Sequence, residues 1–107
     1  MLTKEQINTV QDNNIEAVFV PEWNGEVCVK GMSAIDANTL FLATPDGKNA
    51  NMMGLVLVRC LCDEQGNRLY ADDEAELIGK HPSKVLKPLL DVAMRLSGLG
   101  DEGLEKN

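Results

Sequence analysis

The pattern of apolar and polar positions begins with a short amphipathic segment. Ile7 and Val10 lie three residues apart, which places them on one face of a helix. Thr3 and Gln6 have the spacing of a capping box, in which two side chains satisfy free backbone N–H groups at a helix start. The pattern therefore predicts a short helix over 4–12, ended by the asparagine pair that follows it.

Two β-rich runs come next, at 15–20 and 26–30. Asn24 and Gly25 lie between them, and both residue types tolerate a positive φ, so the pair predicts a tight turn. We therefore expect a two-stranded antiparallel hairpin. Because an isolated hairpin is marginally stable, we also expect helices to cover one of its faces.

A second helix is expected to begin at Ser33, with Asp36 three residues later, and to run through Leu42. A loop over 44–47 follows, rich in residues that break helices. The segment 51–62 is almost wholly apolar, so periodicity does not separate a buried helix from a buried strand. Its length and its Met and Leu content favour a helix.

Beyond a predicted turn at 63–67, the acidic cluster at 72–76 marks another helix start, where carboxylates complement free N–H groups. Gly79 is expected to cap the end of that helix. The apolar stripe over 85–96 predicts a final helix that Gly98 ends. Pro88 lies within this stripe, so either the helix is kinked there or its regular part starts near that residue.

These elements predict an α+β fold: a mostly helical single domain with a two-stranded antiparallel hairpin near the N-terminus, packed on three to five helices. The domain is expected to span 1–97. The segment 98–107 is expected to be a flexible acidic tail.

Charge and composition narrow the class of function. The chain has 107 residues, of which 17 are acidic and 10 basic, for a net charge of -7. This balance opposes nucleic-acid binding, which rewards clustered Lys and Arg. It leaves open an acidic nucleic-acid mimic, although the acidic residues form short clusters and not long runs. The N-terminus lacks a signal-peptide pattern, and no apolar run approaches a membrane span, so we expect a cytoplasmic protein.

Few residues have the pattern of a catalytic or metal site. Cys28, Cys60 and Cys62 are an odd number, which argues for free thiols in a reducing compartment. With His81 they form the alternative of a small metal-binding regulatory domain, but the Cys-x-Cys spacing does not match common zinc sites. The acidic residues of 63–76 are more simply a turn and a helix start than a calcium loop. We expect no catalytic residue, no metal and no cofactor.

A protein-binding role is the remaining interpretation. Methionine side chains are flexible and suit surfaces that must repack on different partners. Met94 is expected to fill the core, because it lies on the helical stripe. Trp23 either anchors a partner or caps the core. The expected partner-binding residues are Trp23, Met32, Met52, Met53 and Tyr70.

Three segments together resemble a known family. They read VRCLCDEQGNRLY at 58–70, DDEAEL at 72–77 and MRLS at 94–97. This order, over residues 27–96, resembles the tail assembly chaperones of long-tailed phages of the lambdoid type (siphophages). The resemblance implies a non-enzymatic factor in the host cytoplasm, absent from the mature virion. Such factors coat the tape measure protein, keep it soluble, recruit tail tube subunits and self-associate into rings or spirals.

The resemblance also raises the hypothesis of a longer, frameshifted product. The residues Glu105, Lys106 and Asn107 can be encoded by an adenine-rich run on which ribosomes slip. The alternative is a plain charged tail. Two other classes of function remain beside the chaperone: the Cys/His metal-binding domain and the acidic nucleic-acid mimic.

Overall fold

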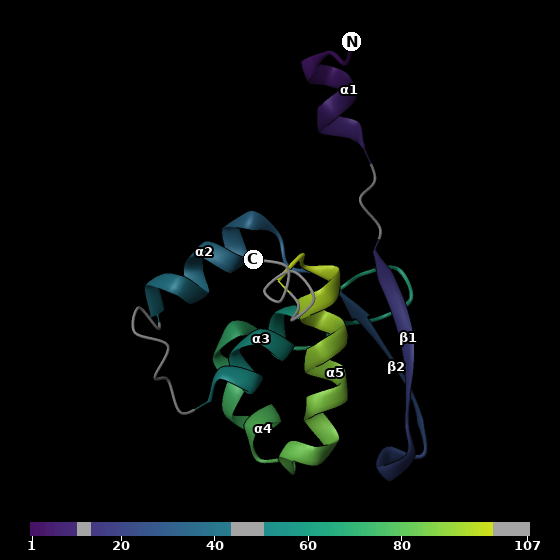
Figure 1. Cartoon of the computed structure of the whole chain (residues 1–107), viewed down its shortest axis with the longest axis vertical. Helices are drawn as coiled ribbons and strands as arrows, with labels where there is room; N and C mark the ends of the chain where they lie inside the picture. Colours follow the sequence, from purple (N-terminus) through teal and green to yellow (C-terminus); the bar gives the residue numbers. More distant parts are fainter. Residues whose placement is uncertain (11–13, 44–50, 100–107) are drawn as a thin grey trace.

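The computed structural model describes residues 1–10, 14–43 and 51–99 (Figure 1). It confirms the α+β class and the N-terminal hairpin. In chain order the elements are α1 (Lys4–Thr9), β1 (Ile15–Val20), the 3-10 turn η1 (Pro21–Trp23), β2 (Gly25–Lys30), α2 (Ala34–Ala43), α3 (Met52–Cys60), β3 (Leu61–Cys62), the 3-10 turn η2 (Asp72–Glu74), α4 (Ala75–Gly79) and α5 (Ser83–Leu96). The predicted loop at 44–47 and residues 100–107 lie outside the described residues, so the division at 97 stays a prediction.

The hairpin is the main part of a three-stranded antiparallel sheet in the order β1-β2-β3. Val18 pairs with Val27, and Val29 pairs with Leu61, so these residues share one face. The helix α5 runs along this side of the sheet (Figure 1), and Val29 is fully buried. Phe19, one residue out of step, is exposed on the other face. The sheet is therefore covered by a helix on one face, as expected because an isolated hairpin is only marginally stable.

The hydrophobic core lies where α3 and α5 meet the sheet. Leu57 and Leu89 are completely buried, and Ile78 of α4 and Leu86 of α5 are nearly so. The ambiguous segment 51–62 is a helix, as favoured, but its last two residues leave the helix to pair with β2. The segment reads as uniformly apolar because both of its parts are buried.

Asn51 brings α3 and α4 into close contact. Its amide nitrogen donates to the carbonyl oxygen of Ala75 over 2.9 Å, and its side-chain oxygen accepts from the N–H of Gly54 over 3.3 Å. Gly79 does not cap α4 as predicted: the C-cap residue is Lys80, and Gly79 has no positive φ. A side chain at Gly79 would instead collide with Asn51, so this glycine is required by packing.

The other predicted helix ends follow local rules. Thr3 and Gln6 form the expected capping box at the start of α1, which ends at Thr9 and is shorter than predicted. The helix α5 starts at Ser83 and continues through Pro88, so its regular part does not begin at the proline. Gly98 ends it with φ 77°, and the N–H of Leu99 donates to the carbonyl of Met94 over 2.8 Å.

Candidate functional site

An apolar groove opens between α2, α3 and α5, with a volume of about 170 Å³. Three methionines and three aliphatic residues form most of its surface: Met32, Met52, Met94, Leu40, Val56 and Leu90. Ala37 and Leu99 complete the lining. Because the described residues that line this groove are all apolar, it is suited to apolar side chains and not to an ion or a polar ligand.

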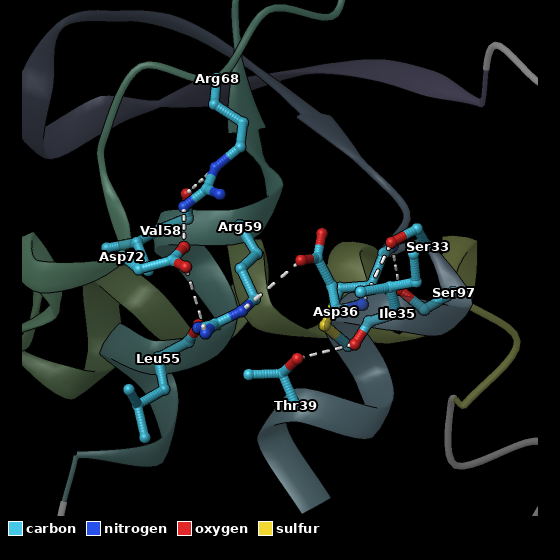
Figure 2. Close-up of polar contacts among 11 residues, drawn as sticks. Ser33, Ile35, Asp36, Thr39, Leu55, Val58, Arg59, Arg68, Asp72 and Ser97 are labelled. Atoms are coloured by element: carbon cyan, nitrogen blue, oxygen red, sulfur yellow. Dashed lines mark hydrogen bonds and ion pairs between the residues drawn. The ribbon is translucent and has the colours of Figure 1, made fainter. Parts of the chain in front are cut away.

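The wall that α2 forms is held at its first turn. The backbone N–H of Met32 donates to Ser97 Oγ at the end of α5 over 2.8 Å, and Ser97 Oγ donates to the carbonyl of Ala93 over 2.6 Å. Ser33 Oγ accepts from the N–H of Asp36 over 3.1 Å, as the helix-start pattern predicted (Figure 2). The residues just before α2 are therefore hydrogen-bonded to the C-terminal end of α5.

The helix α2 carries apolar side chains on two opposite sides. Leu40 is buried and lines the groove. Ile35 and Leu42, seven residues apart on the other side, are 78% and 82% exposed. A helix that is apolar on both sides is normally buried on both. The outer side of α2 is thus a second surface available to another polypeptide.

A buried arginine joins α2 to the rest of the protein. Arg59 of α3 is only 5% exposed, and its Nη1 donates to the carbonyl of Leu55 over 2.7 Å. Its Nε lies 3.9 Å from Asp36 Oδ1 of α2, and its Nη2 lies 3.8 Å from Asp72 Oδ2 of η2 (Figure 2). Among the residues that the structure describes, the Nε has no hydrogen-bond partner. Arg59 therefore balances two carboxylates on separate elements through charge more than through hydrogen bonds.

Arg68 completes this cluster. Its Nη2 donates to Asp72 Oδ1 over 2.6 Å, and its Nε donates to the carbonyl of Val58 over 3.0 Å. The hydrogen bond from Arg68 lowers the pKa of Asp72, and the charge of Arg59 adds to the effect. The sequence analysis missed this cluster. Its one signal was Arg59 itself, the single charge in an otherwise apolar run.

Comparison with solved structures gives an informative likeness. No protein-family model matches the sequence, and no curated protein matches it. A solved structure, the tail assembly chaperone of bacteriophage HK97, has a TM-score of 0.63 with this chain and covers 89% of it and 90% of the HK97 chain. This chain has the fold of a phage tail assembly chaperone. The two sequences are 20% identical, so the likeness confirms at the level of the fold the resemblance indicated by the sequence.

The groove of this fold brings together two of the five residues expected to bind a partner. Met32 and Met52 line it, whereas Met53 and Tyr70 are partly buried against the core. Met94, expected in the core, packs against the core and also lines the groove. The role of these residues in partner binding stays a prediction. The sequence analysis did not identify the aliphatic lining residues, since their apolar stripes resemble any core-facing stripe.

Trp23 lies at the hairpin turn, where it is partly exposed. Its ring centroid is 5.0 Å from that of His81, with an angle of 62° between the ring planes. His81 is thus in contact with an aromatic ring at the hairpin turn.

The three cysteines are free thiols. Cys28 and Cys62 are direct partners across β2 and β3, and Cys60 is buried at the end of α3. Burial is the main cause that raises the pKa of Cys60 to about 12, and it raises the pKa of Cys62 as well. Over residues 1–10, 14–43 and 51–99, no group of three or more His, Cys, Asp or Glu is arranged to hold a metal ion. The described geometry therefore gives no support to the metal-binding alternative.

The thiols provide a first testable prediction. We expect Cys28, which is partly exposed, to react first with Ellman's reagent in the folded protein. Cys60 and Cys62 are expected to react only as the protein unfolds, because burial keeps both thiols protonated and shielded. The absorbance time course, with and without denaturant, measures the two classes. Cys28→Ser should remove the fast phase, and fast reaction of all thiols in the native protein would contradict the buried geometry.

Asp63 and Glu74, in the acidic region 63–76, have structural roles. Asp63 Oδ1 accepts from the backbone N–H groups of Gln65 and Asn67, each over 2.9 Å, in the predicted turn. The hydrogen bond from the Asn67 backbone is the first cause of the lowered pKa of Asp63. Glu74 accepts from the N–H of Ala71 over 2.7 Å at the next helix start.

Within the described part of the chain, no helix has the length and apolar character needed to cross a membrane.

Proposed function

We propose that this protein is a phage tail assembly chaperone that binds the tape measure protein and keeps it soluble in the host cytoplasm until tail tube subunits enclose it. The proposal rests mainly on one observation, the open apolar groove between α2, α3 and α5. Its fold, shared with the HK97 tail assembly chaperone, supports the proposal. The role needs no catalytic step and leaves the protein absent from the finished particle.

The groove has the chemistry that this role requires. A long helical partner presents apolar stripes, and an apolar groove binds such a stripe through side chains one helical turn apart. Met32, Met52 and Met94 adapt to side chains of different shape, so one groove accepts many segments of one partner. The exposed side chains of Ile35 and Leu42 extend the apolar surface to the outer side of α2.

Charge and repetition account for the solubilising effect. Each copy carries a net charge of -7, so a partner covered by many copies repels other covered partners. Contacts that are weak for a single copy become strong when several copies associate along one partner. Many copies of a small acidic domain can thus cover the apolar surface of a long helix and keep it soluble.

Co-expression with a candidate tape measure protein, to be sought among neighbouring genes as a long product rich in coiled coil, tests the proposal. The wild-type protein is expected to keep that product in the supernatant. Met52→Asp places a charge in the groove and is expected to weaken binding about tenfold or more, which corresponds to at least about 1.4 kcal/mol. Met52 is the first residue of α3, where a carboxylate is tolerated by the helix dipole, so the variant should fold.

Leu77→Asp is the matched control. It adds the same charge at an exposed leucine of α4 that does not line the groove. The control should solubilise the partner as well as the wild type does, and circular dichroism should show that both variants are folded. If the candidate tape measure protein is equally insoluble with and without the wild-type protein, the proposed function is wrong.

A further inference from the structure

The helix α1 and the residues that flank it carry apolar side chains that their own protomer leaves exposed. Leu2, Ile7 and Val10 are 66%, 58% and 51% exposed, and no residue of 1–10 is buried. Figure 1 shows α1 projecting beyond the start of β1, away from the helices that form the core. Here we call residues 1–10 the arm.

The arm has the sequence signals of a helix start, but its helix is too short to be stable alone. Its capping box is formed, and Leu2 and Ile7 occupy the two positions, before the cap and at the fourth helical residue, that pair in a hydrophobic staple. A helix of 6 residues is nevertheless marginal in water, since helices gain most of their stability by burying an apolar face. The arm therefore needs an apolar surface to cover it.

The groove of a second copy is a surface of the required kind. The described residues that line it are all apolar, and the arm has three apolar side chains to insert. Lys4 and Glu5 are the only charged side chains of the arm and cancel, so the arm approaches a body of net charge -7 without repulsion. We propose that the arm of one copy binds in the apolar groove of another copy.

This contact is head to tail, because the arm and the groove are different surfaces of one chain. Each copy offers an arm and accepts one, so the contact repeats until a ring closes or an open assembly grows. The inference shares only the groove with the proposed function, and it does not depend on the identity of the cargo. Where the groove also takes the cargo, the arm and the cargo compete for it.

Sedimentation equilibrium of the purified full chain tests the proposal. The wild-type mass is expected to rise with concentration above that of one copy. Ile7→Asp on the apolar side of α1 should weaken self-association about tenfold or more. Asn8→Asp is the matched control, since it adds the same charge on the opposite side of this exposed helix and should leave the mass unchanged. Neither change touches the core, so folding should be retained.

Mixing two defective variants gives the most specific result. Ile7→Asp retains an intact groove, and Met52→Asp retains an intact arm. Each is expected to be monomeric alone, and an equal mixture is expected to form a dimer that does not grow further. The proposal is overturned if the wild type is monomeric at all concentrations, as it would be if the arm bound its own groove, or if Ile7→Asp has the wild-type mass, or if the mixture stays monomeric.

The same variants separate this proposal from the proposed function. Ile7→Asp leaves the groove free for cargo, so it should still keep the tape measure candidate soluble. If the cargo is insoluble with the wild type and with every variant, the chaperone role is wrong. This result would not affect the proposal of the arm contact. Loss of the arm contact alone would leave the chaperone role intact.

Discussion

Replacing Asp36 and Asp72 together with asparagine is expected to lower the free energy of unfolding by about 3 kcal/mol, the low end of the range for an uncompensated buried charge. The reason is that Arg59 is only 5% exposed and has these two carboxylates as its neighbours of opposite charge at 3.9 Å and 3.8 Å. Without them its guanidinium stays buried and charged. The low end applies because the Asp36 and Asp72 side chains are 30% and 60% exposed, so water reaches this site in part.

Urea denaturation followed by circular dichroism measures this loss. Asp91→Asn is the control, because Asp91 forms a shorter ion pair with Lys87, at 2.6 Å, but both side chains are more than half exposed. Its cost should be no more than about 0.5 kcal/mol. Adding Arg59→Met to the double variant should restore most of the loss, since the buried charge is then gone. Equal costs for the control and the double variant would show that burial of Arg59 is not the cause.

Gly54→Ala is expected to destabilise the protein by about 1–3 kcal/mol, the usual cost of overpacking. Helix propensity alone predicts the opposite, a gain of about 1 kcal/mol for alanine over glycine inside a helix. The structure reverses the sign because a Cβ at Gly54 would collide with the carbonyl oxygen of Ala75. That Cβ would also lie 2.6 Å from Asn51 Oδ1, so α3 and α4 would have to move apart.

The matched control for this change is Gly25→Ala. A Cβ at Gly25 would meet no atom closer than the carbonyl oxygen of Trp23 at 3.9 Å, and Gly25 has no positive φ. Its stability should be unchanged or raised by about 0.4–1 kcal/mol through the unfolded state. Thermal and urea unfolding of the two variants measure the difference. A gain for Gly54→Ala would mean that the close approach of α4 to α3 is absent in solution.

The two proposals place the same groove at the centre of the protein's function. Its walls come from α2, α3 and α5, and α2 is attached through Ser97 just before its start and through Arg59 at its first turn. A loss of either attachment should therefore affect the shape of the groove as well as stability. The arm and the cargo are both apolar, and the methionines of the groove are suited to accept either one.

The sequence by itself determined the features that depend on neighbouring residues. The capping box of Thr3 and Gln6, the positive φ of Asn24 at the hairpin turn and the cap at Ser33 depend on residues at most four apart, so the local sequence specifies them. Gly25, predicted to share that turn, is instead the first residue of β2 and has no positive φ. The periodicity of 85–96 likewise predicted α5, and alternation over 15–20 predicted β1. The overall class followed, because these elements bury their apolar faces in only a few ways.

Only the tertiary structure decided which surfaces stay open. Met32, Val56 and Met94 line one groove although they are far apart in the chain, and no local pattern distinguishes them from core residues. Gly79 was expected to be a cap, but contact with Asn51 of another helix decides its identity. The balance of Arg59 against Asp36 and Asp72 likewise joins three separate elements. The sequence shows which side chains are apolar and tend to be buried. The packing of segments that are distant in the chain decides which residues cover them.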